Sequence, residues 1–274
     1  MAEARLYANP PLSLVTAEVR LAHEPRLEEG AELNRFIGLL RHDFPVVSTE
    51  QVQLSVRDVS PTGGGVVDRT FDQIRGADID KTRMVSLQPR FLTFATTGQD
   101  YRGFDASMVP FIRASIESLL TVAPYAVLEG IGLRYINEIR MPDEDSGLDE
   151  WRLWVREDVL SIAAATSGSC RGFRVMSHSH EQDGPDLFGT TVMCGSHWGV
   201  SVIGDTSPLA PTAANPRQAI VIDIDGNWVP AKTQLLKLVD TLPIFDRLHR
   251  LADEPFEWFL TDHARAQFGG QPHA

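Results

Sequence analysis

Hydrophobic and polar residues alternate along the first well-patterned stretch of the chain. Within Leu12–Ala22, Val15, Val19 and Leu21 are separated by polar residues such as Glu18. A period of two places alternate side chains on opposite faces of a strand. The stretch therefore predicts a β-strand with one buried face and one solvated face.

Helical spacing follows in two places. Leu33, Phe36 and Ile37 share one face of a predicted helix, and a second apolar stripe covers about Ser107 to Leu120. Between the two helices lie short extended segments separated by turn residues, a pattern typical of an antiparallel meander. These segments are Gln51–Val59, Thr70–Ala77, Thr82–Gln88 and Phe91–Thr97.

The order of elements then repeats. Leu128–Ile139 predicts a long strand, and the spacing of Trp151 and Val155 predicts a short helix after it. The extended segments that follow are Gly172–His180, Leu187–Cys194 and Ala219–Ile224. We therefore predict an α+β fold of two pseudo-duplicated β-α-β(3–4)-α units, residues 1–123 and 124–274, as two halves or one continuous domain. Each unit would lay its helices on one face of a curved antiparallel sheet.

Gly226, Pro243 and Pro255 predict where the last strand and the C-terminal helices begin or end. Asp225–Gly226 and Gly226–Asn227 are common turn dipeptides, so the strand before them is expected to end there. We expect a helix from near Thr233 that Pro243 bends or breaks, and a last helix with Pro255 in its first turn.

Composition and charge narrow the classes of function. The 274 residues are 43% hydrophobic, and 25 basic against 37 acidic residues leave a formal net charge of −12. An acidic chain repels phosphate, so nucleic acid and anionic membrane surfaces are unexpected partners. No apolar run approaches the ~18 residues of a membrane span. With only Cys170 and Cys194, no disulfide framework is expected, and a reducing cytoplasm fits.

The strongest metal-like pattern combines histidines and a cysteine, both of which are good zinc ligands. It consists of His178, His180, Cys194 and His197. His178 and His180 are two residues apart in a predicted strand and share a face. In a plain hairpin, Cys194 lies ~16 Å along the strand from His178, at ~3.3 Å per residue. The alternative is a polar strand face with half-buried histidines, and we expect no resident cofactor.

A candidate anion site combines Arg20, Arg134 and Glu138. Arg20 and Arg134 occupy equivalent places in the two predicted units, and Glu138 shares a strand face with Arg134. Two guanidiniums near a pseudo-twofold axis would hold a carboxylate or phosphate bidentately. The alternative is that each arginine pairs with a neighbouring glutamate such as Glu18 or Glu129.

Four segments together carry a family resemblance. They are Asn9–Arg20, Met84–Phe104, Gly132–Ile139 and Leu248–Trp258, and they include the Asn-Pro-Pro opening, a Leu-Arg-Tyr-Ile-Asn sequence and a C-terminal Leu-His. Over nearly its full length, the chain resembles an uncharacterised, sporadically distributed bacterial protein family of about this length. The resemblance implies a cytoplasmic bacterial protein and brings no catalytic residues. A patchy distribution is associated with accessory genes, such as defence or toxin-neutralising systems.

The function expected from these observations is binding. No serine-hydrolase elbow occurs, and Cys170 or Cys194 would need a nearby histidine to act as a nucleophile. We expect a non-catalytic adaptor that binds a protein partner, or a second copy, through its sheet face, a groove or an edge strand. The alternative is a small-molecule or anion-binding protein or an enzyme, metal-assisted in one version, with a pocket between sheet and helices.

Overall fold

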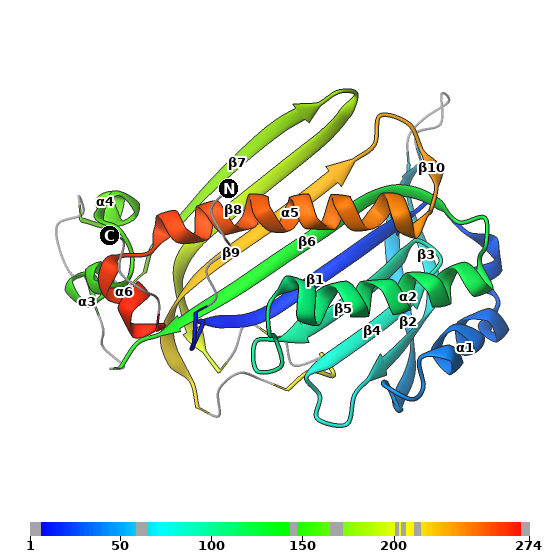
Figure 1. Ribbon diagram of the computed structural model, residues 1–274, viewed down its shortest axis with the longest axis horizontal. Helices are drawn as coiled ribbons and strands as arrows, with labels where there is room; N and C mark the ends of the chain where they lie inside the picture. Colours follow the sequence, from blue (N-terminus) through cyan, green and yellow to red (C-terminus); the bar gives the residue numbers. More distant parts are fainter. Residues whose placement is uncertain are drawn as a thin grey trace.

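A computed structural model describes most of the chain, namely residues 7–58, 65–142, 147–164, 172–200, 203, 207–210 and 215–269. Its centre is one open antiparallel sheet of ten strands, which confirms the predicted α+β class (Figure 1). The strand order is β2-β3-β4-β5-β1-β6-β9-β8-β7, and β10 pairs with β6. The strands are β1 Leu12–Leu21, β2 Val46–Asp58, β3 Gly65–Ala77, β4 Arg83–Gln88, β5 Phe91–Thr97, β6 Val127–Arg140, β7 Arg174–Asp183, β8 Asp186–Gly199, β9 Arg217–Val229 and β10 Gln234–Leu235.

The two predicted units meet at the middle of the sheet, where β1 and β6 pair antiparallel. In each unit the last long strand, β5 or β9, returns to pair with the first. The helices are α1 Gly30–Leu39, α2 Val109–Val122, α3 Leu148–Trp154, α4 Glu157–Ala164, α5 Leu238–Phe259 and α6 Asp262–Gln267, with short turns η1 Pro25–Glu28 and η2 Phe104–Met108. Figure 1 shows α1, α2 and α5 on the same face of the sheet. No helix of the described residues is long and apolar enough to cross a membrane.

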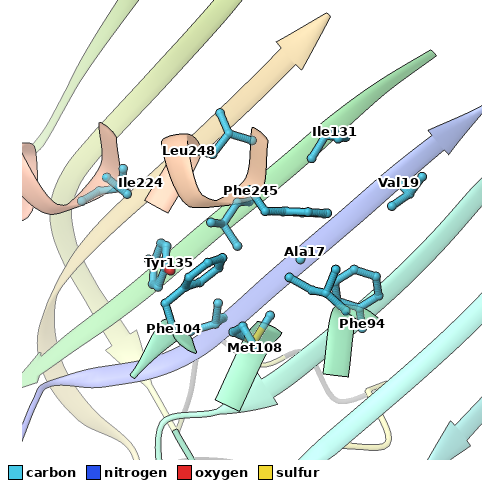
Figure 2. Packing of buried hydrophobic residues seen from close by; sticks show 14 of the residues in the cluster. Ala17, Val19, Phe94, Phe104, Met108, Ile131, Tyr135, Ile224, Phe245 and Leu248 are labelled. Carbon is cyan, nitrogen blue, oxygen red and sulfur yellow. The ribbon is translucent and has the colours of Figure 1, made fainter. Parts of the chain in front are cut away.

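The core lies between this face and the helices. Val15, Val19 and Leu21 are fully buried there, as the alternating pattern predicts. Phe245 and Leu248 of α5 pack over the central strands (Figure 2). Because α5 and β1 belong to different units, one hydrophobic core joins the two halves.

The segment that contains Pro243 and Pro255 forms one helix, α5, where two helices were expected. α5 runs from Leu238 to Phe259 through both Pro243 and Pro255. A proline inside a helix costs a hydrogen bond, but tertiary packing of an apolar stripe dominates helix stability. That stripe is continuous across both prolines and consists of Thr241, Phe245, Leu248, Ala252 and Phe259.

The strand expected to end before Asp225 continues to Val229, so the predicted turn is wrong. Gly226 lies inside β9, where a Cβ atom would come within 3.4 Å of both the Leu133 carbonyl oxygen and Leu248 Cδ2. Gly226 therefore lies within the paired strand beneath α5 rather than turning the chain.

Candidate functional site

A pocket of about 1160 Å³ lies between α5 and the helix-covered face of the sheet. The sheet contributes Leu12 from β1, Tyr135 and Asn137 from β6, and Ile224 from β9. The remaining lining comes from residues 7–10, from residues 98–106 and from α5. The pocket thus combines segments of both halves of the chain.

Two glycines shape the wall formed by residues 98–106. A Cβ atom on Gly98 would lie 1.7 Å from the Leu12 carbonyl oxygen, so only glycine allows this approach to β1. Gly103 has a φ of 103°, in the left-handed region, and precedes the π-helical turn η2. The Arg102 backbone N–H donates to Ser107 Oγ at 2.7 Å and fixes the start of that turn. This backbone path places Phe104 in the pocket wall.

Polar side chains from several elements converge inside the pocket. The Tyr135 hydroxyl lies 2.9 Å from His249 Nδ1, and the same nitrogen is 3.7 Å from Asp253 Oδ1. The rings of Tyr101 and Tyr135 meet edge to face, with centroids 6.3 Å apart. The His249 ring stacks on Phe104 with centroids 4.6 Å apart. Figure 2 shows Phe104 and Tyr135 side by side between the sheet and the helices.

Burial sets the protonation of this network. It raises the pKa of Tyr101 to about 12, and it holds the pKa of Tyr135 well above its ordinary value, so both are neutral phenols. Burial also lowers the pKa of His249, which favours the neutral imidazole at pH 7. Burial, aided by the charge of Glu257, raises the pKa of Asp253 to about 6. Asp253 is therefore ionised at pH 7 but close to its titration range.

The predicted anion-site arginines lie on the opposite, open face of the sheet. Arg134 binds Asp223 with two hydrogen bonds, of 2.8 and 2.6 Å, and Arg20 Nε lies 3.0 Å from Glu18 Oε1. The β1–β6 register pairs Arg134 with Thr16, four residues from Arg20, or ~13 Å at ~3.3 Å per residue. Each guanidinium contacts its own carboxylate. Burial raises the pKa of Asp225, and both guanidiniums lower it electrostatically against that rise.

Glu138 also belongs to the open face but is buried, with 1% of its side chain exposed. It forms an ion pair with Arg140. Arg140 also donates to the carbonyl oxygens of Gly199, at 2.7 Å, and Val200, at 2.6 Å. This pair ties the end of β8 to the sheet.

The four metal-candidate residues are divided between the two faces. Cys194 is fully buried on the helix side, and burial raises its thiol pKa to about 12. His178 and His180 lie on the exposed strand β7, with ring centroids 4.3 Å apart, and His178 Nδ1 lies 2.7 Å from Thr191 Oγ1. His197 follows six residues along β8 from Thr191. In the described part of the chain, no three His, Cys, Asp or Glu residues are grouped to hold a metal ion, while Cys170 lies outside that part.

Sequence reasoning missed the pocket residues, because no short spacing joins them. Asn9, Tyr101, Tyr135 and His249 all line the pocket, and they come from four separate parts of the chain. Segments far apart in the chain thus converge on one cavity. The chain matches no protein-family model and no curated protein sequence.

Proposed function

We propose that the protein binds a small organic molecule in the pocket between α5 and the sheet. The observation that carries this proposal is the convergence of Tyr101, Tyr135, His249 and Asp253 in a cavity of about 1160 Å³. Binding sites for small molecules are concave and mostly apolar, with a few polar groups that orient the ligand. Groups with shifted pKa values cluster at such sites, and burial shifts the pKa values of all four residues.

The proposal is tested with three aromatic probes of equal size and different charge: benzylamine, benzyl alcohol and benzoate. Saturation-transfer NMR on the full chain measures the binding of each. Ala252→Phe fills the pocket from α5, and Ala106→Trp narrows it from the opposite wall. Ala266→Trp, on an exposed position of α6, is the matched control.

We expect at least one probe to bind, and both pocket variants to weaken it while the control does not. Absence of binding by all three probes contradicts the proposal, as does binding that neither pocket variant weakens. Thermal unfolding of each variant distinguishes a blocked pocket from a lost fold.

A second candidate function is pairing with a protein partner through β7. This strand is at one edge of the sheet, and almost all of its residues are exposed. Met176 is 73% exposed, and no strand of the described chain pairs with its outer edge. An open edge offers backbone groups to an extended segment of a partner.

Hydrogen exchange tests this second candidate. The protein isolated from its host with any bound chain is compared with the recombinant chain alone. Slower exchange at alternate amides of Arg174–Asp183 in the isolated complex would support edge pairing. Equal exchange in both samples would contradict it.

A further inference from the structure

The pocket has aromatic walls. Side chains of this kind come from the N-terminal segment, from the wall at residues 98–106, from β6 and from α5; they are Tyr7, Tyr101, Phe104, Tyr135 and Phe256. The face of an aromatic ring carries negative electrostatic potential and attracts a cation that lies over it. Such walls favour an apolar ligand that carries positive charge over one that carries negative charge.

The charged groups of the lining are mainly acidic. They are Arg102, Asp105 and Asp253. Arg102 is exposed, and its guanidinium donates to the backbone carbonyls of Gln99, at 3.0 Å, and Tyr101, at 3.3 Å. Its hydrogen-bonding capacity is therefore partly used by its own loop. The two carboxyl groups come from opposite walls of the pocket, η2 and α5.

Asp253 is the partly buried carboxyl group of the lining, whereas Asp105 is exposed. Within the described residues, the one basic side chain within 4 Å of it is His249, whose Nδ1 is 3.7 Å away and also contacts the Tyr135 hydroxyl. The neighbouring acid Glu257 is different, because it accepts a hydrogen bond from Tyr7 at 2.6 Å and contacts Arg265 at 3.2 Å. About 40% of the Asp253 side chain remains exposed, so a ligand can reach it.

We infer that the pocket binds an organic amine in its cationic form, with the ammonium group at Asp253 and the apolar part against the aromatic walls. This inference rests on the proposed function and names its ligand class. An ammonium donates charge-assisted hydrogen bonds to a carboxylate and gains further from the ring faces. A carboxylate ligand would instead be placed beside Asp253 and Asp105. The pocket therefore selects by charge as well as by shape.

The test measures dissociation constants for benzylamine, benzyl alcohol and benzoate at pH 7.5 by NMR titration of the full chain. We expect benzylamine to bind most tightly and benzoate most weakly. Asp253→Asn is expected to weaken benzylamine about tenfold, since it removes a charge-assisted hydrogen bond and leaves the shape of the side chain. The same variant should change benzyl alcohol less than about twofold.

Glu254→Gln is the matched control, because Glu254 is the next residue on α5, is exposed and does not line the pocket. It should leave all three constants unchanged. Equal binding of the three probes, or tighter binding of benzoate, overturns the amine inference while the pocket proposal stands. An equal loss of benzylamine in Asp253→Asn and Glu254→Gln also overturns it, because the effect would then be one of general charge.

Discussion

Arg134 on the open face and Asp253 on the helix side differ in how far their charge is compensated. Arg134 and Tyr135 are neighbours in β6 and point to opposite faces. On the open face, Arg134 is matched by Asp223 with two hydrogen bonds. On the helix side, Asp253 reaches no closer basic group among the described residues than His249 at 3.7 Å. Charges paired within the fold stabilise the scaffold, whereas an uncompensated charge in a cavity is available to a ligand.

The largest expected effect on stability comes from the open face. Arg140→Met leaves the Glu138 carboxylate buried without this ion pair, so the free energy of unfolding should fall by about 3 kcal/mol. Urea denaturation measures it. Benzylamine binding should not change in the folded variant. Arg250→Met removes an exposed pair with Asp246 and is the control, with little expected change. Equal losses in the two variants would contradict the account.

The next prediction concerns Asp253, whose charge is expected to favour ligand binding but to lower the stability of the fold. The pKa of Asp253 is raised from its ordinary 3.8 to about 6, so at neutral pH the ionised carboxylate disfavours the folded state. This cost is absent below the unfolded pKa of 3.8, develops between 3.8 and about 6, and is complete above about 6. Asp253→Asn should therefore keep or raise the stability at pH 7, by up to about 1 kcal/mol because the group is partly exposed. A clear fall in Tm would show that the fold needs this charge.

The affinity for benzylamine should depend on pH in the same range. Lowering the pH from 7.5 to 5 protonates Asp253, whose pKa is about 6, and should weaken binding about tenfold. Protonation of His249 at low pH adds positive charge beside Asp253 and acts in the same direction. Asp253→Asn should lose most of this dependence. A profile that is equally steep in the variant would assign the effect to another group.

The smallest effect is expected at the ion pair between the half-exposed Arg134 of β6 and the largely buried Asp223 of β9. Asp223→Asn weakens the two hydrogen bonds to Arg134, whose side chain is 47% exposed. Solvent screens such a pair, so the loss of stability should be about 1 kcal/mol or less. Thermal unfolding measures it, and benzylamine titration should show no change. Loss of benzylamine binding here would mean that the open face, rather than the pocket, holds the amine.

Local pattern predicted much of the fold. The alternation in β1 and the apolar stripe of α1 are local signals, and both elements formed where expected. The predictions of a helix break at Pro243 and a turn at Gly226 were wrong, because the effect of each residue depends on what packs against it. The stripe of α5 continues past the proline, and the glycine lies under that same helix. A sequence shows these residues without the partners that determine their role.

The candidate site was harder to predict for a related reason. Tyr101, Tyr135 and His249 come from three distant segments, and no short spacing joins them. The residues that did show short spacing, His178 and His180, lie on an exposed edge strand. The expectation of a pocket between the sheet and the helices came closer to the observed cavity than the histidine pattern did, because it depends on the layers of the fold rather than on a short motif.

The most direct measurement is the titration of the Asp253 carboxyl carbon by NMR, in the free protein and with saturating benzylamine. The account predicts a pKa of about 6 in the free protein, because burial and Glu257 disfavour the charge. Bound benzylamine should lower that pKa, because an ammonium stabilises the carboxylate. A pKa near the ordinary 3.8 in both samples, unaffected by benzylamine, would contradict the claim that Asp253 binds the ammonium group of the ligand.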